Sequence, residues 1–192
     1  EKTKRSDLSF FLDLCGDNGM ALKISARQLI IFDEEKYEAA DALITIVKPG
    51  TIYEAATEMI YLPAMLGYSF TRKLRDVYAA CHVKYQQGQN KALIEATFTA
   101  PGKTGKTLQV QEQVENTADA ERLAKKRLRE KNCDEVTGSL TLPGSFYLVA
   151  GVTVNMLGFG AYDGKYIITE AQHNIGGGYT TGISVRRCLD GY

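Results

Sequence analysis

A glycine- and lysine-rich run, GKTGKT, occupies residues 102–107 and has the residue types closest to a phosphate-binding loop. Such a loop has the pattern G-x-x-x-x-G-K-[ST]: backbone N–H groups surround the phosphates, the lysine reaches the terminal phosphates and the hydroxyl binds Mg²⁺. The Gly-Lys-Thr at 105–107 supplies the second half, but Ala100 stands where the first glycine is needed. The loop must also open a helix, whereas residues 108–114 alternate like a strand. The run therefore predicts a flexible hairpin connection between two strands, not a nucleotide site.

The two histidines and two acidic pairs are the other candidates for catalysis. His82 lies within a predicted strand, and His173 lies in a strand that enters three glycines. Partners of a Ser-His-Asp or Cys-His site meet in space, so such a site stays open, but the sequence has no G-x-S-x-G, H-E-x-x-H or H-x-E with C-x-x-C pattern. The acidic pairs are Glu34 with Glu35, and Asp134 with Glu135. They lie in polar segments, whereas catalytic carboxylates need a cleft that raises a pKa. We therefore predict hydrogen-bonded sheet histidines, solvated carboxylates, and no catalytic, cofactor or metal site.

The cysteines and the charge balance restrict the class of protein. The four cysteines are far apart in the 192 residues: Cys15, Cys81, Cys133 and Cys188. This spacing is a poor zinc signature and a poor disulfide framework, so it predicts free thiols in a reducing cytosol. Lys plus Arg equals Asp plus Glu at 23 each, whereas a dedicated nucleic-acid binder usually has a basic excess. We interpret the basic run KKRLREK at 125–131 as the solvated face of a helix. The apolar runs are too short for a membrane span.

Apolar periodicity predicts a small α/β subdomain at residues 1–62. A helix is expected to begin at Ser6, with apolar residues at positions i, i+3, i+4 and i+7. Apolar runs at 20–24 and 29–32 indicate a β-hairpin, and no assignment follows for residues 51–66. The sequence starts at Glu1 in a polar stretch without an initiator Met, so we expect a piece of a longer protein or a processed chain.

Residues 63–192 predict strands and one helix. Alternating apolar residues indicate strands at 77–85, 92–99, 108–114, 137–142, 152–156, 165–174 and 179–187. A helix is predicted at 117–132, with Asn116 as its cap. Its narrow apolar stripe consists of Ala120, Leu123, Ala124 and Leu128. Glycine turns between long strands indicate a meander that closes. The predicted fold is mainly β (α+β): an antiparallel β-barrel with one flanking helix, plus the small α/β helix-hairpin subdomain.

Two parts of the chain resemble one known family. SDLSFFLDLCGDNGMALKISARQLIIF, at 6–32, is similar to the helix and hairpin of phage late control protein D and of the hub region of VgrG proteins. In that family an acidic, aromatic helix precedes a glycine and a two-stranded hairpin. AERLA at 120–124 is followed in order by GSLTLPG, AGVTVNMLGFG and DGKYIITEAQHNIGGGYTTGISVRR, which resemble the C-terminal barrel of the same family. The matches occur in the family's order and cover most of the chain.

The resemblance implies a structural baseplate hub of a contractile phage tail or phage-like injection particle, which adapts the tail tube to the central spike. In that family three copies form a ring, each with two related barrels, so the expected partners are the chain itself as a homotrimer, the tail tube protein and the central spike protein. The N-terminal barrel of the family has no counterpart in this sequence. No enzyme activity, specific nucleic acid or membrane span is implied, and the expected location is the tail baseplate of a particle made in the bacterial cytoplasm. A hub-associated cell-wall hydrolase is the alternative, and a standalone ligand-binding β-barrel is a further one.

Overall fold

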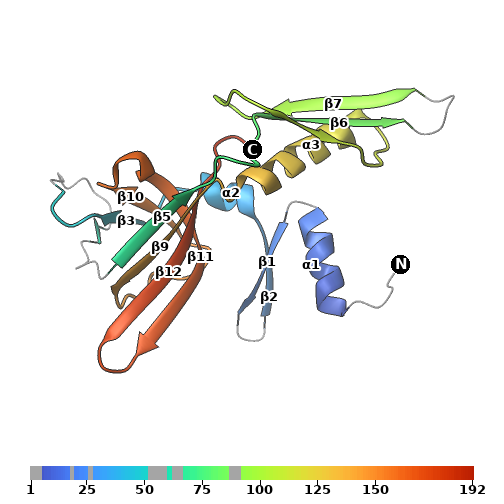
Figure 1. Cartoon of the computed structure of the whole chain (residues 1–192). Helices are drawn as coiled ribbons and strands as arrows, with labels where there is room; N and C mark the ends of the chain where they lie inside the picture. Colours follow the sequence, from blue (N-terminus) through green and yellow to red (C-terminus); the bar gives the residue numbers. More distant parts are fainter. Residues whose placement is uncertain (1–5, 18–19, 26–27, 52–59, 62–66, 87–91) are drawn as a thin grey trace. The chain divides into compact units, whose positions relative to one another are not determined.

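The chain divides into two compact units, 1–40 and 41–192 (Figure 1). The computed structural model describes residues 6–17, 20–25, 28–51, 60–61, 67–86 and 92–192. The sequence-based boundary at 62 differs from the boundary at 40 because two later strands, β3 (Ile44–Val47) and β4 (Ile60–Tyr61), join the sheet of the larger unit. Most of the unassigned segment 51–66 lies outside the described residues.

The smaller unit is a helix followed by a hairpin and a short second helix. Its elements are α1 (Asp7–Asp17), β1 (Met20–Ser25), β2 (Gln28–Asp33) and α2 (Glu34–Ala39). The antiparallel pairing of β1 with β2 confirms the predicted hairpin, and α1 confirms the predicted helix. Helix α2 was not predicted from the sequence, and the acidic pair Glu34 and Glu35 lies in its first turn. It begins there because the Asp33 carboxylate accepts the Glu35 N–H at 3.1 Å.

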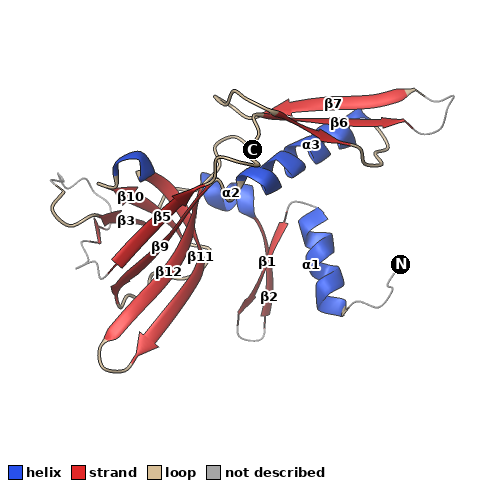
Figure 2. Ribbon diagram, viewed as in Figure 1, coloured by secondary structure: helices blue, strands red, loops and turns tan. Residues whose placement is uncertain are grey.

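The larger unit contains a seven-stranded mixed sheet (Figure 2). Its further strands are β5 (Gly67–Arg72), β9 (Val136–Pro143), β10 (Thr153–Leu157), β11 (Gly164–Ile175) and β12 (Tyr179–Arg187), with a single 3₁₀ turn, η1 (Gly160–Tyr162), between β10 and β11. The strand order is β4-β3-β10-β11-β12-β9-β5. The predicted antiparallel pairing holds from β10 to β5, whereas β3 runs parallel to β10 and to β4.

One apolar core collects side chains from strands near both ends of this sheet. Ile44 and Ile46 of β3 and Leu140 of β9 are buried in it, and Phe70 of β5 packs against it. The Phe70 ring stacks on the Tyr162 ring, with 5.0 Å between centroids. A sheet whose distant strands share one core must curl around that core. Its closure into a barrel stays a prediction, because the described residues show no backbone pairing between β4 and β5.

A second sheet of three strands lies against the long helix of the same unit. It is built from β6 (Ala80–Gln86), β7 (Leu93–Thr99) and β8 (Thr107–Val110), and the helix is α3 (Thr117–Asn132). Strand β6 is central, antiparallel to β7 and parallel to β8, and α3 packs on β6 and β7. The mainly β class with one flanking helix is therefore confirmed. The predicted cap is also confirmed, since Asn116 Oδ1 accepts the Asp119 N–H at 2.9 Å.

The buried face of α3 follows the predicted stripe. Ala120, Ala124 and Leu128 have no exposed surface, and they share a core with Cys81 and Val83 of β6. Cys81 and Val83 are two residues apart in β6, so their side chains lie on the same face of the strand. This core is separate from the core inside the seven-stranded sheet, so the larger unit needs further contacts to join the two.

We predict that Gly138→Ala destabilises the larger unit. Gly138 of β9 is opposite Phe70 of β5, and a Cβ at Gly138 would lie 2.6 Å from Phe70 Cδ1. Relief of this overlap must displace a core ring, so we expect the free energy of unfolding, measured by urea denaturation, to fall by about 1–3 kcal/mol.

Gly182→Ala is the matched control for that measurement. Gly182 lies in β12 of the same sheet, and a Cβ there meets no heavy atom within 4 Å. We expect this variant to change the free energy of unfolding by less than about 1 kcal/mol. Equal losses in both variants would contradict the steric argument.

Candidate functional site

The GKTGKT segment connects β7 to β8. These strands lie on opposite sides of β6, so the connection crosses β6 and the predicted hairpin is wrong. Thr107 begins a strand, which confirms the predicted strand after the segment. A phosphate-binding loop needs a helix N-terminus at that point. The structure therefore excludes this context for nucleotide binding.

Backbone and packing contacts fix this connection at several points. The N–H of Ala100 bonds to the Ala79 carbonyl at 2.8 Å, and the Ala79 N–H bonds to the Lys106 carbonyl at 2.8 Å. Pro101 packs against Gly191, where a Cβ would lie 2.8 Å from Pro101 Cγ. Gly191 also has φ of +80°, a conformation that favours glycine. The segment expected to be a flexible turn is thus anchored to the chain that follows β12.

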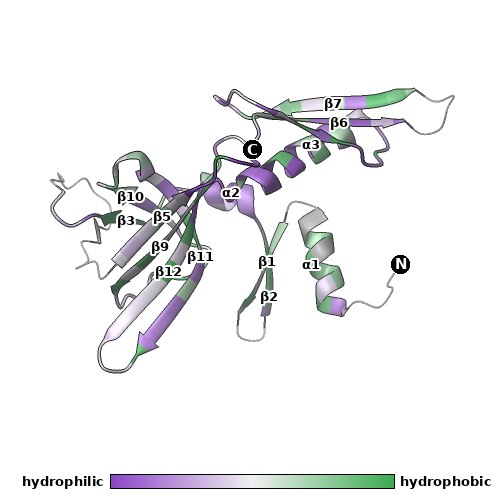
Figure 3. Ribbon diagram, in the orientation of Figure 1, coloured by the Kyte–Doolittle hydropathy of each residue, from purple (hydrophilic) through white to green (hydrophobic). Residues whose placement is uncertain are grey.

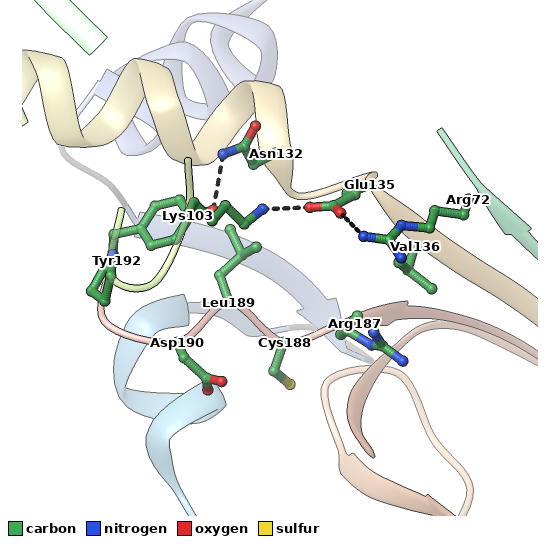
Figure 4. A pocket seen from close by; sticks show the side chains of 11 residues that line it. Arg72, Lys103, Asn132, Glu135, Val136, Arg187, Cys188, Leu189, Asp190 and Tyr192 are labelled. Atoms are coloured by element: carbon green, nitrogen blue, oxygen red, sulfur yellow. Dashed lines mark hydrogen bonds and ion pairs between the residues drawn. The ribbon is translucent and has the colours of Figure 1, made fainter. Parts of the chain in front are cut away.

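A cavity of about 260 Å³ lies beside this anchor, where four segments of the larger unit meet (Figure 4). The segments are the end of β5, the connection between β7 and β8, the end of α3, and the residues from 187 to 192. The charged residues in its lining are Arg72, Lys103, Glu135, Arg187 and Asp190. We take this cavity as the candidate site because it gathers charged side chains from segments far apart in the sequence.

Glu135 is the centre of an ion-pair cluster in the cavity wall. Arg72 Nη2 donates to Glu135 Oε1 at 3.0 Å, and Lys103 Nζ donates to Glu135 Oε2. Burial alone would raise the pKa of Glu135, but the hydrogen bonds and charges of Lys103 and Arg72 outweigh burial and hold that pKa below its usual value. Burial would lower the pKa of Lys103, but its contacts with Glu135 and Tyr192 raise it.

Asn132 is the buried polar group next to this cluster. It has no exposed surface. Its Oδ1 accepts the Tyr78 N–H at 3.0 Å, and its Nδ2 donates to the Tyr78 carbonyl at 2.8 Å and to the Tyr192 hydroxyl at 2.9 Å. The three bonds fasten the end of α3 to the residues before β6 and to the end of the described chain.

The arrangement supports a structural role for the cavity. Both oxygens of Glu135 accept from cations of the protein itself. Arg187 donates to the Ala161 and Asp163 carbonyls at 3.0 and 2.9 Å and to the Tyr166 hydroxyl at 3.1 Å. These are polar contacts within the protein, not a nucleophile paired with a base, although the buried Nε of Arg187 has no hydrogen-bond partner among the described residues. Sequence analysis missed the cluster because Lys103 and Arg72 lie 32 and 63 residues from Glu135. The acidic pair Asp134 and Glu135 was the only signal of this cluster in the sequence. The prediction of solvated carboxylates is wrong for Glu135, whose side chain is 16% exposed.

The structure does not bring the two histidines together. His82 of β6 has Nδ1 2.8 Å from Thr97 Oγ1, and His173 of β11 has Nδ1 2.9 Å from the Tyr179 hydroxyl. They lie in different sheets, and both are hydrogen-bonded sheet histidines, as predicted. Burial raises the pKa of Cys81 to about 11, which disfavours the reactive thiolate. Within the described segments no group of three His, Cys, Asp or Glu residues can hold a metal ion, and no helix there has the length and apolarity to cross a membrane.

The basic run at 125–131 lies on α3, and two of its basic residues, Lys126 and Arg127, are paired with acids. Arg127 donates to both Glu112 oxygens at 2.8 and 2.7 Å and to Glu130 at 2.7 Å. These hydrogen bonds raise the pKa of Arg127. Lys126 also lies 3.8 Å from Glu130. Lys126 and Arg127 therefore belong to an ion-paired face of α3, and at 14% and 32% exposure they are less solvated than predicted.

Comparison with solved structures finds this fold in phage and prophage tail proteins. A prophage MuSo2 43 kDa tail protein from Shewanella oneidensis aligns over 98% of this chain with a TM-score of 0.71 and 12% identity. A tail protein from Neisseria meningitidis MC58 aligns over 93% with a TM-score of 0.67 and 12% identity. Prophage tail protein gp18 from Listeria monocytogenes EGD-e aligns over 94% with a TM-score of 0.55 and 14% identity. At these identities the likeness establishes the fold.

The aligned region is a part of each of those proteins. This chain spans about half of their length: 57% of the Shewanella protein, 54% of the Neisseria protein and 52% of the Listeria protein. No family model matches the sequence, and no curated protein sequence matches it. The comparison therefore defines a class, proteins with this phage-tail fold, and leaves the role within a particle to be proposed.

We predict that Glu135→Gln destabilises the chain in a pH-dependent way. The pKa of Glu135 is lower in the folded chain than in the unfolded chain, so its stabilisation is present above the unfolded pKa of about 4.3 and is lost as the pH falls through the folded pKa. At pH 7 we expect the variant to lose about 1–3 kcal/mol of the free energy of unfolding, because a charge-assisted bond is replaced by a neutral one.

Urea denaturation at several pH values checks this prediction. The difference between wild type and Glu135→Gln is expected to shrink steadily below about pH 4. Glu170→Gln is the control, because Glu170 is exposed on β11. This variant should lower the free energy of unfolding by less than about 0.5 kcal/mol at each pH measured. A difference that stays constant with pH would show that the charge of Glu135 is not involved.

Proposed function

We propose that this protein is a structural component of a phage tail or phage-like particle. The observation that carries the proposal is the shared fold over more than nine-tenths of the chain with three solved tail proteins. No family model and no curated protein sequence matches the chain, which is compatible with the proposal because the shared fold persists at 12–14% identity.

Within such a particle we propose the role of baseplate hub, which adapts the tail tube to the central spike. The order of helix-hairpin and barrel segments, similar to late control protein D and VgrG hubs, supports this finer assignment. In this role three copies form a ring, with the tube protein and the spike protein as its other partners. Heterologous contacts that close by rotation produce such a ring. The particle is assembled in the bacterial cytoplasm, and the protein resides at the baseplate.

We propose that the role is structural and not enzymatic. The histidines are bonded to hydroxyl groups in two different sheets, and the Glu135 carboxylate is held by two cations. A hub-associated cell-wall hydrolase is the competing assignment. It requires a clearing zone in a gel that contains peptidoglycan, and we expect none for this chain.

Deletion of the coding sequence in the strain that produces the particle tests the hub. We expect electron microscopy to show particles without assembled baseplates or tails, and a plasmid copy of the gene to restore them. A Glu135→Gln copy is a useful comparison, since it changes stability and leaves the outer surface intact. Normal tails in the deletion strain would sink the proposed function.

A further inference from the structure

Strand β11 has an outer edge that the described strands leave uncovered over residues 169–175. On this side β10 pairs only as far as Ile167 of β11, and Ile168 bonds to the main chain of Gly151 and Val152. Beyond Ile168 no backbone partner for this edge is found in the part of the chain that the structure describes. An unpaired edge presents N–H and C=O groups that a further strand can bond. The stretch TEAQHNI contains no proline or lysine and one charged residue, Glu170. A register shift between Ile168 and Glu170 places a bulge at its first residue, Thr169, and the residues after this bulge lack the proline and lysine that usually prevent such pairing.

Strand β7 presents a second edge of the same kind. It borders the three-stranded sheet, whose order is β7-β6-β8. It has seven residues, LIEATFT, the same length as the segment 169–175. It also contains no proline or lysine, and its one charged residue is Glu95. Exposure alternates along β7: Leu93, Glu95, Thr97 and Thr99 are exposed, and the residues between them are half-buried. The hydropathy colours also change along this strand (Figure 3).

We propose that residues 169–175 of one copy pair with β7 of a second copy as antiparallel strands in full register. This register places Thr169 opposite Thr99, His173 opposite Glu95, and Ile175 opposite Leu93. Threonine pairs and apolar pairs stabilise neighbouring strands, and a histidine N–H opposite a carboxylate adds a hydrogen bond. A parallel alignment forms none of the three, since it places His173 opposite Thr97 and Ile175 opposite Thr99. The complementarity of the two edges identifies the second strand as a copy of this chain.

The hydrogen bonds of His173 orient its ring for the contact with Glu95 of the second copy. Its Nδ1 lies 2.9 Å from the Tyr179 hydroxyl and 3.2 Å from Thr181 Oγ1. Thr181 Oγ1 already accepts the Ser145 N–H at 3.1 Å, so its own proton is available for Nδ1. With Nδ1 as acceptor, Nε2 carries the ring proton and can donate to the Glu95 carboxylate of the second copy. Glu95 Oε2 lies 3.9 Å from His82 Nε2 of its own chain, and the Glu95 side chain is 55% exposed, so the carboxylate can also accept from the second copy.

The two edges are different, so the contact can repeat. A copy that offers its β11 edge to one neighbour still has its β7 edge for another, and a contact of this kind closes into a ring when the rotation between copies fits. Main-chain hydrogen bonds then supply the affinity, and the alternate side chains set the register. The inference rests on the proposed function for the presence of several copies, and it names the surface by which they associate.

Cross-linking of two cysteine variants tests the register directly. Ile175→Cys and Leu93→Cys are made in separately tagged chains, both also carrying Cys133→Ser because Cys133 is partly exposed. Residues opposite each other in an antiparallel pair have Cα atoms about 4.5–5.5 Å apart, which suits a disulfide. After mixing and mild oxidation, we expect a disulfide-linked dimer that contains both tags.

Leu74→Cys in place of Leu93→Cys is the matched control. Leu74 is 87% exposed and Leu93 is 43% exposed, so random collision would link the control faster. We expect the Ile175→Cys and Leu93→Cys pair to link about tenfold faster than the control, since strand pairing holds its thiols together. Equal or slower linkage would overturn the proposed pairing.

A charge exchange provides a second test by light scattering over a concentration series. His173→Glu and Glu95→Lys are each expected to weaken self-association by about threefold, and the double variant to restore it. Gln172→Glu is the control, because it adds the same charge one residue away, opposite Ala96. Single variants that associate like wild type, a double variant without recovery, or a wild-type chain that stays monomeric would each overturn the pairing. Normal tails in a strain with Glu95→Lys would overturn it too, while the effect of gene deletion would still decide the proposed function.

Discussion

The side-chain amide of Asn132 makes three hydrogen bonds in a place with no access to water. A buried amide left unpaired costs about 1–3 kcal/mol, so helix α3, Tyr78 and Tyr192 must meet at this point. Three residues later, Glu135 bonds to Arg72 at the end of β5 and to Lys103. One short stretch of chain therefore connects the core under α3 to the seven-stranded sheet. Buried polar networks of this kind specify one arrangement of packed elements when all of their members are satisfied.

Local patterns in the sequence were sufficient for the elements that depend on near neighbours. The helix at 117–132 was predictable because its cap and apolar stripe lie within the same few turns. The strands were predictable because apolar and polar residues alternate along a strand that is buried on one face. The parallel pairing of β3 with β10 was not, because it joins segments far apart in the sequence, such as Ile44 and Val154. Helix α2 is only six residues long, too short for an apolar period. The ion-pair cluster depends on three separate segments, and no spacing rule relates them.

Lys103, the first of the two lysines in GKTGKT, shows how the same residue types serve different chemistry. A phosphate site needs backbone N–H groups that converge at the start of a helix, whereas this segment crosses β6 and continues as a strand. Lys103 then finds its anion within the protein, in Glu135. The histidines follow the same principle, since each is bonded to a hydroxyl of a neighbouring strand. The residue types alone do not decide between a phosphate site and an internal ion pair; the strand order decides it.

The segment that follows β12 belongs to the core beneath α3. Tyr192 is 2% exposed there, and Leu189 packs beside it. On the ribosome, α3 and the strands around it emerge well before these residues. The core beneath α3 lacks Leu189 and Tyr192 until synthesis reaches the last part of this sequence. This core therefore cannot be completed when α3 itself is made. The larger unit is therefore expected to fold late and as a whole, and an interval with exposed apolar surface on α3 is one in which chaperones can bind the nascent chain.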